Sequence, residues 1–126
     1  METFKNFLPL FLLVLSLTGC AQNKTTEILT MEEFKERIRN NDSTMVILDV
    51  RTDAEVTGKL PKIEGALHIP LQELANRVDE LEQFRNKEIA VVCRTQNRSS
   101  VAAEFLKEKG YNAKSVTGGM KAFYKK

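Results

Sequence analysis

The chain has 126 residues, and its 19 Lys and Arg side chains exceed its 17 Asp and Glu side chains by a net charge of +2. The charges are interspersed, and only the final pair Lys125-Lys126 forms a basic run. A protein that binds nucleic acid needs a clustered basic face, so the charge pattern argues against such a partner. About 100 residues follow the apolar N-terminus, which is enough for one domain and too few for two.

The first residues of the chain have the character of an export signal. Lys5 gives a thin positive region, and an apolar stretch runs over Phe7–Leu17. A membrane-spanning helix needs about twenty apolar residues, so this shorter stretch fits the apolar region of a secretory signal peptide better. Leu17-Thr18-Gly19-Cys20 resembles the bacterial lipoprotein box, although an ordinary signal peptide with a chance cysteine is the alternative.

The lipoprotein resemblance implies a division of the N-terminus. Residues 1–19 would be the signal peptide, and residues 20–27 would be the lipidated Cys20 followed by a polar tether. One acyl chain holds a protein at a membrane only marginally, whereas two or more hold it stably. We therefore expect a lipid-anchored protein of the bacterial cell envelope, facing the periplasm or the exterior.

The first half of the remaining chain predicts a helix, a strand and a second helix. Thr30-Met31-Glu32-Glu33 has the pattern of a capping box, so a helix begins there and ends at Asn40-Asn41-Asp42. Met45–Val50 is a nearly continuous apolar strand, as expected in a parallel sheet covered on both faces. Apolar residues at helical spacing predict a further helix over Leu71–Phe84.

The second half continues the alternation of strands and helices. We predict a strand over Glu88–Val92, a helix over Ser99–Lys109 that ends at Gly110, a strand over Asn112–Val116 and a helical turn over Met120–Tyr124. Alternating elements predict an α/β fold with a central parallel sheet and helices on both faces. Ligands of such sheets bind beyond the carboxyl ends of the strands. Cys93 and Asp49-Val50-Arg51 both lie at such ends.

Cys93 is the candidate nucleophile. It follows a buried strand and precedes a polar loop made of Arg94, Thr95, Gln96, Asn97, Arg98 and Ser99. The start of the next helix directs free N–H groups and the positive end of its dipole at the sulfur, which favours the thiolate, and Arg98 adds positive charge. Free cysteine is often only a buried core residue, but the polar residues that follow favour the functional interpretation. If Cys20 is lipidated, Cys93 has no disulfide partner within the chain.

The loop that begins at Cys93 resembles the active-site loop of the rhodanese (sulfurtransferase) family, in which Cys, four residues, Arg and then Ser or Thr follow one another. Three further segments resemble the family in the right order: Asp49-Val50-Arg51 with Glu55, Gly65–Pro70, and Gly110-Tyr111 with Val116–Gly119. The resemblance runs from about residue 28 to residue 124. It implies a rhodanese-like domain over residues 28–126.

The resemblance implies that Cys93 takes a sulfane sulfur from a small anionic donor, such as thiosulfate or polysulfide, and holds it as a persulfide. A thiol or another nucleophile would then accept the sulfur, and neither a cofactor nor a partner subunit is implied. The backbone N–H groups of residues 94–99 would surround the sulfur. Arg98 would either bind the donor's oxyanion or hold the loop through a carboxylate, and both roles stay open.

The other candidate residues receive supporting roles. Arg94 would shape the entrance, and Ser99 and Ser100 would cap the helix or contact the sulfur. Asp49 and Arg51 would form an ion pair or a loop anchor. His68 is the chain's only histidine and is assigned to a turn or the surface, and one His with one free Cys does not make a metal site.

Departures from the family pattern leave alternatives open. Gln96 stands where the family often has Gly, the segment Gly58–Ala66 is two residues longer and lacks a His, and Phe123 replaces a Trp. One alternative is a non-catalytic docking module with this fold. The other is a Cys-dependent phosphatase or arsenate reductase, whose loops have five residues between Cys and Arg where this chain has four.

Overall fold

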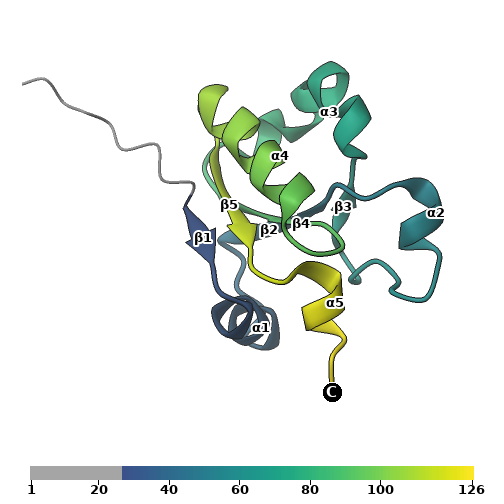
Figure 1. Cartoon of the computed structure of the whole chain (residues 1–126). Helices are drawn as coiled ribbons and strands as arrows, with labels where there is room; N and C mark the ends of the chain where they lie inside the picture. The colour runs from purple at the N-terminus through teal and green to yellow at the C-terminus, as the bar shows by residue number, and fades with distance from the viewer. Residues whose placement is uncertain (1–26) are drawn as a thin grey trace, which may run out of the picture.

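The computed structural model describes residues 27–126, so the predicted signal peptide and the predicted lipidation site Cys20 lie outside the described residues. Five parallel strands form one sheet in the order β1-β5-β4-β2-β3 (Figure 1). The strands are β1 Ile28–Leu29, β2 Met45–Asp49, β3 Leu67–His68, β4 Glu88–Val92 and β5 Asn112–Val116. β4 is central, and its register pairs Val92 with Asp49 at the end of β2. The residues that follow these two strands therefore leave the sheet side by side.

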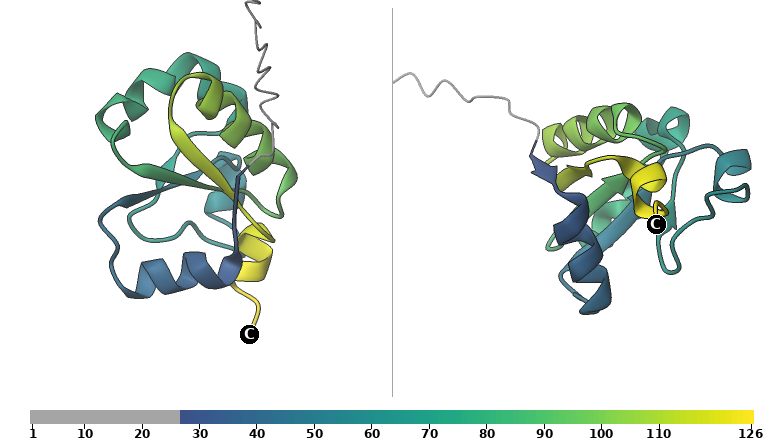
Figure 2. Two further views of the ribbon diagram at one scale, coloured as in Figure 1. Left: turned by 90° about the vertical axis from the view of Figure 1, so that its left-hand side faces the viewer. Right: turned by 60° about the horizontal axis from the view of Figure 1, so that its bottom comes forward.

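Helices cover both faces of the sheet (Figures 1 and 2). They are α1 Met31–Arg39, α2 Asp53–Val56, α3 Leu71–Arg77, the 3₁₀-helix η1 Val78–Phe84, α4 Asn97–Glu108 and α5 Gly119–Phe123. One apolar cluster joins α3, η1 and α4 to the sheet and includes Leu48, Val91 and Leu106. The second joins α1 and α5 to the opposite face and includes Phe34 and Met120. The predicted α/β fold with a central parallel sheet is confirmed.

The predicted capping box at the start of α1 is present. The Thr30 hydroxyl accepts a hydrogen bond from the Glu33 backbone N–H, and the Glu33 carboxylate accepts one from the Thr30 N–H. Phe34 is fully buried against the sheet. The helix ends at Arg39, and Asn41 then adopts a left-handed conformation (φ 49°) that reverses the chain.

The helix predicted over residues 71–84 is only half α-helical. The α-helix ends at Arg77, and the chain continues to Phe84 as a 3₁₀-helix. The physical reason lies in the sequence, because Val78, Leu81 and Phe84 recur every third residue, which is the period of a 3₁₀-helix. All three pack against the same apolar cluster, and Leu81 is fully buried.

The helix after the Cys93 loop begins at Asn97, two residues earlier than predicted. Its N-cap position is Gln96, which forms no side-chain cap bond. Ser99 and Ser100 therefore lie within the first turn, and the prediction that they cap the helix is wrong. The short elements β1, α2 and β3 were not predicted, because segments of two to four residues carry no periodicity. Within residues 27–126, none of the helices has the length and apolar character needed to cross a membrane.

Candidate active site

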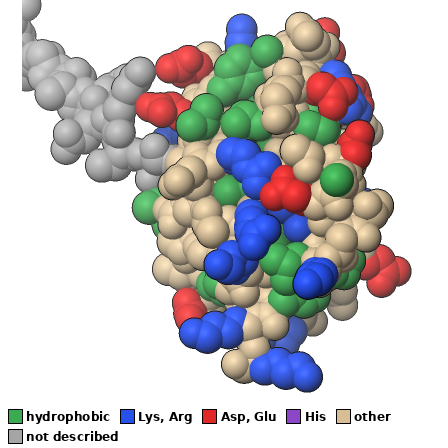
Figure 3. Space-filling model, turned by 45° about the vertical axis from the view of Figure 1, so that its right-hand side comes forward, with side chains coloured by type: hydrophobic (Ala, Val, Ile, Leu, Met, Phe, Trp, Pro, Cys, Tyr) green, Lys and Arg blue, Asp and Glu red, His purple; other side chains and the backbone are tan. Residues whose placement is uncertain are grey.

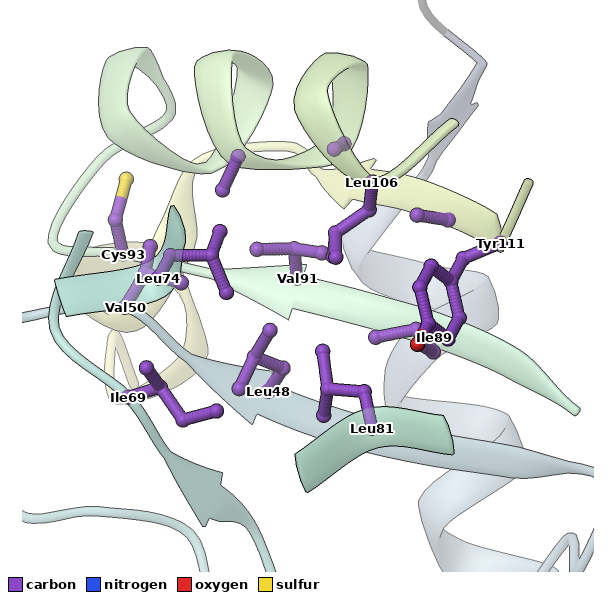
Figure 4. Packing of buried hydrophobic residues seen from close by; sticks show 13 residues of the cluster. Leu48, Val50, Ile69, Leu74, Leu81, Ile89, Val91, Cys93, Leu106 and Tyr111 are labelled. Atoms are coloured by element: carbon purple, nitrogen blue, oxygen red, sulfur yellow. The ribbon is translucent and has the colours of Figure 1, made fainter. Parts of the chain in front are cut away.

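Cys93 follows directly after β4 and lies at the boundary between the core and the loop. Its side chain is buried, with 1% of its surface exposed, and the sulfur points toward the start of α4 (Figure 4). The thiol donates a hydrogen bond to the Ser99 hydroxyl over an Sγ–Oγ distance of 3.5 Å. The polar residues after Cys93 led us to prefer a functional cysteine to a buried core residue, and the structure shows that the side chain is buried all the same.

A buried row of hydroxyl groups lies behind the thiol. Ser99 Oγ is 2.8 Å from Ser115 Oγ, and it donates to the backbone carbonyl of Gln96 at 2.9 Å. Ser100 donates to Ser115 at 3.3 Å. Since the single proton of Ser99 points to the Gln96 carbonyl, Ser115 is the donor to Ser99. Ser115 was not predicted as a site residue, although a serine in the middle of a buried strand is a signal that could have found it.

The hydroxyl row suits both ionisation states of Cys93. The neutral thiol donates to Ser99. When the thiol loses its proton, the Ser99 hydroxyl can turn from the Gln96 carbonyl and donate to the sulfur instead, while Ser115 continues to donate to Ser99. The N–H groups of the first turn of α4 are the free donors of a helix N-terminus, and the dipole there favours a negative charge.

Arg98 is held by Glu55. Its two terminal nitrogens each lie 2.7 Å from a carboxylate oxygen of Glu55, which is the paired geometry that gives strong ionic hydrogen bonds. These bonds lower the pKa of Glu55 to about 2 and raise the pKa of Arg98, to which the nearby Cys93 and Asp49 also contribute. Glu55 is itself oriented by the capping box of α2 with Thr52. Of the two roles left open for Arg98, the structure shows the loop-holding one.

Asp49 and Arg51 form the ion pair that the sequence predicted. Both side chains are buried, and the Arg51 Nε and Nη2 atoms lie 2.8 to 3.1 Å from the Asp49 carboxylate. The remaining nitrogen of Arg51 donates to the Leu60 carbonyl at 2.6 Å. The pair therefore fixes the segment that follows α2, and α2 itself carries Glu55. His68 lies on β3 and places Nε2 2.7 Å from the Arg51 carbonyl oxygen, so it belongs to the same support.

The loop is also held from the other face by the start of α5. The N–H groups of Met120 and Lys121 donate to the carbonyls of Cys93 and Arg94 at 2.8 and 3.0 Å. A β-carbon on Gly119 would lie 2.3 Å from the Thr95 carbonyl oxygen, and Gly119 has a φ of +56°. Only glycine fits this position, because the two backbones approach too closely for a side chain.

The remaining loop residues face outward. The side chains of Thr95 and Asn97 are exposed, and that of Gln96 is half-buried. Arg94 is exposed and lines a cavity of about 600 Å³ beside the loop. The cavity also contacts Glu55, Leu60 and Tyr124. Cys93 is not among the residues that line this cavity, so the role of Arg94 at the entrance stays a prediction.

Comparison with known proteins identifies the family. Residues 30–126 match the rhodanese-like domain. The chain belongs to the rhodanese-like domain family. The relatives of this rhodanese-like protein include a putative sulfurtransferase of Bacillus subtilis, YtwF, which is 33% identical over 91 residues that cover 71% of this chain and 82% of that protein.

Other relatives of this rhodanese-like protein are larger or structurally characterised. A putative sulfur carrier protein of Bacillus subtilis, YrkF, is 36% identical over 66% of this chain and 42% of its own length. The chain thus spans less than half the length of some curated relatives that it matches. A rhodanese-related protein of Thermoplasma volcanium superposes with a TM-score of 0.67 and 32% identity, covering 77% of this chain and 89% of that one.

Proposed function

We propose that this rhodanese-like protein is a sulfurtransferase that carries a sulfane sulfur as a Cys93 persulfide. The observation that carries the proposal is the position of Cys93, at the end of the central strand and hydrogen-bonded to the first turn of α4. Its relatives named as sulfurtransferase and sulfur carrier support the same chemistry.

The proposed reaction has two balanced steps. The Cys93 thiolate attacks the outer sulfur of a donor such as thiosulfate, a new S–S bond forms, and the S–S bond of the donor breaks as sulfite leaves with the electron pair. A thiolate or another nucleophile then attacks the outer sulfur of the persulfide, and the electron pair returns to Sγ. Ser99 and the N–H groups of the loop would stabilise the negative charge at each stage. The attacking form of cysteine must be the thiolate.

Turnover tests the proposal. We expect the domain to release sulfite from thiosulfate in the presence of a thiophilic acceptor such as cyanide, and Cys93→Ser to abolish that release. The far-ultraviolet circular dichroism of the variant should match that of the parent protein, because Ser differs from Cys by one atom. Sulfite release by a folded Cys93→Ser variant would disprove the role of Cys93.

A second candidate function is a docking module, and the burial of Cys93 favours it. In that case no donor would modify Cys93, although the fold would be intact. The phosphatase alternative is less well supported, because the loop has four residues between Cys93 and Arg98, and the terminal nitrogens of Arg98 are already bound to Glu55. Hydrolysis of an aryl phosphate by the protein would support the phosphatase alternative.

The cellular location is part of the proposal. A lipid on Cys20 and a tether over residues 21–27 would hold a monomeric domain at the surface of a bacterial membrane, facing the periplasm or the exterior. The support is the sequence Leu17-Thr18-Gly19-Cys20. Labelled palmitate should enter the full-length protein expressed in bacteria, and Cys20→Ser should prevent it.

A further inference from the structure

Positive charge collects on the side of the molecule that presents α2 and α5. Four exposed basic side chains there line one cavity, and none has an ion-pair partner among the residues that the structure describes: Lys59, Arg94, Lys121 and Lys125. The carboxylate in the cavity, Glu55, is already paired with Arg98. We call the four residues the basic face, and Figure 3 shows basic side chains gathered around an acidic one on this side. They come from three separate segments, so the sequence alone shows only interspersed charges.

The charge of the molecule is unevenly distributed. The whole chain has a net charge of only +2, so four unpaired positive charges on one face leave the remainder net negative. α3 and η1 lie at the end of the molecule opposite α5 (Figures 1 and 2) and carry four exposed acidic side chains: Glu73, Asp79, Glu80 and Glu82. A negatively charged surface would attract the basic face and repel the opposite end, and would thereby orient the molecule.

The basic face also presents surface that suits the boundary between water and lipid. The ring of Tyr124 is 40% exposed, and its hydroxyl donates to the Pro61 carbonyl at 3.0 Å. An aromatic ring with one polar end favours such a boundary. Buried Arg51 donates to the Leu60 carbonyl at 2.6 Å and so fixes the segment that carries Lys59. A surface that is already ordered loses little conformational entropy when it binds.

The chain enters the fold close to the basic face. The Glu27 carbonyl accepts a hydrogen bond from the Ser115 N–H, and the Leu29 carbonyl accepts one from the Thr117 N–H, so β1 lies beside the residues that lead into α5. Glu27 is seven positions after Cys20, and seven residues span at most about 25 Å. A domain of this size is roughly 30 Å across. A lipid on Cys20 would therefore keep the domain within about one diameter of the bilayer.

We propose that the basic face docks on the anionic headgroups of the bilayer that holds the lipid anchor. This rests on the proposed lipidation of Cys20. Clusters of four or more Lys and Arg next to a membrane anchor bind anionic lipid, and each such residue strengthens the binding roughly fivefold. The short tether favours the bilayer over an acidic protein, because the bilayer is always within reach. Arg94 belongs to the basic face and directly follows Cys93, so docking turns the active-site loop toward the headgroups.

Vesicles test the docking without the lipid anchor. The sheet and both apolar clusters lie within residues 27–126, so a domain that begins at Ala21 is used and its fold is verified by circular dichroism. We expect its partition coefficient onto vesicles of equal parts phosphatidylglycerol and phosphatidylcholine to exceed that onto phosphatidylcholine alone by roughly tenfold or more at low salt. The difference should disappear at high salt. Equal partition onto the two kinds of vesicle at low salt would overturn the proposal.

Removal of charge shows which face docks. Lys59→Gln, Lys121→Gln and Lys125→Gln combined should lower the partition coefficient onto the anionic vesicles by roughly tenfold or more. All three side chains are exposed, so the variant should keep the fold of the parent domain. A folded triple variant that binds as the parent does would contradict the proposal.

A second triple variant, Lys87→Gln, Lys107→Gln and Lys109→Gln, is the matched control. It removes the same net charge, but Lys87 precedes β4 and the other two residues lie at the end of α4, whereas the basic face adjoins the loop that follows β4. It should bind the anionic vesicles nearly as well as the parent domain. Equal losses in the two triple variants would show that only the net charge matters, and the proposed orientation would be wrong.

The remaining outcomes separate the docking from the lipid anchor and from a protein partner. If palmitate does not label Cys20 yet the domain binds anionic vesicles through the basic face, only the proposed lipidation fails. If palmitate enters Cys20 and the domain shows no preference for anionic vesicles, only the docking fails. A domain that binds soluble polyglutamate and not the anionic vesicles would assign the basic face to an acidic protein, and the docking proposal would be wrong.

Discussion

At the scale of single residues, the site depends on hydroxyl groups that stand behind the sulfur. Ser99 lies on α4, Ser115 lies on β5, and Cys93 directly follows β4, so the row of hydroxyl groups joins the sulfur to two elements of the core. A buried hydroxyl that loses its partner retains the cost of its desolvation. The reactivity of Cys93 should therefore depend on Ser115, which does not touch the sulfur.

The first prediction concerns Ser115. Ser115→Ala should lower the free energy of unfolding by about 1 to 2 kcal/mol. It should also slow the reaction of Cys93 with iodoacetamide, because Ser99 no longer receives a hydrogen bond from Ser115 when it donates its own proton to the thiolate. Urea unfolding and the alkylation rate measure the two effects. Ser100→Ala removes only the outer hydroxyl and should change the alkylation rate less. Equal rates in both variants would show that Ser115 does not support the thiolate.

The second prediction concerns the pair of Arg98 and Glu55. If Arg98 acts by holding the loop, Arg98→Ala and Glu55→Ala should slow sulfur transfer by similar factors, and the double variant should be little slower than either single one, since both break the same interaction. Transfer from thiosulfate is measured in all three variants. An Arg98→Ala variant much slower than Glu55→Ala would show that Arg98 also contacts the donor.

At the scale of elements, the loop is held between the start of α4 and the start of α5. The close approach of Gly119 to the Thr95 and Cys93 carbonyls makes the closing helix a support of the active site. We predict that Gly119→Ala lowers the free energy of unfolding by about 2 to 4 kcal/mol, from the left-handed backbone and the clash together.

Gly65 supplies the control for Gly119. It also has a positive φ, of +80°, but a β-carbon there would meet nothing within 4 Å. Gly65→Ala should therefore lower the free energy of unfolding only by the cost of a left-handed backbone conformation, about 1 to 2 kcal/mol. It should leave sulfur transfer unchanged. Equal losses of stability in the two variants would show that the close contact between Gly119 and the loop does not contribute to the free energy of unfolding.

Comparison of these elements with the sequence shows where prediction succeeds. β4 and β5 were placed at their observed bounds, because Ile89–Val92 is a continuous apolar run and Gly110 ends the preceding helix with a φ of +89°. The start of α4 was misplaced because no side chain caps it. The pairing of Arg98 with Glu55, which are 43 residues apart, and the burial of Cys93 both depend on how α2 and α5 close on the loop. A local pattern does not contain that information.

At the scale of the whole molecule, the carboxylates make the fold sensitive to acid. The pKa of Glu55 is lowered to about 2 by Arg98, and that of Asp42 is lowered to about 2 by Thr44 and Arg37. Because these pKa values lie below those of the unfolded chain, 4.5 and 3.8, the folded state binds fewer protons between pH 4.5 and 2. The contribution of these two carboxylates to the free energy of unfolding is therefore fully present above this pH window, and it is lost as the pH drops through it.

This acid dependence gives a further prediction. Glu55→Gln should make the loss of stability between pH 5 and pH 2 shallower, by roughly 1 kcal/mol at most, since the pair is partly exposed. Urea unfolding at several pH values measures the slope. Glu64→Gln, which alters an exposed carboxylate outside the active-site loop, should keep the slope of the parent protein. An unchanged slope in Glu55→Gln would contradict the role assigned to Glu55.

The central claim is that Cys93 carries a persulfide, and the most direct test is the intact mass of a domain that begins after Cys20. The protein is incubated with thiosulfate and, separately, with polysulfide. We predict a gain of one sulfur atom that a thiol reductant removes and that Cys93→Ser does not show. A folded protein with a free Cys93 thiol that gains no sulfur from either donor would contradict the account and leave the docking module as the better explanation of this fold.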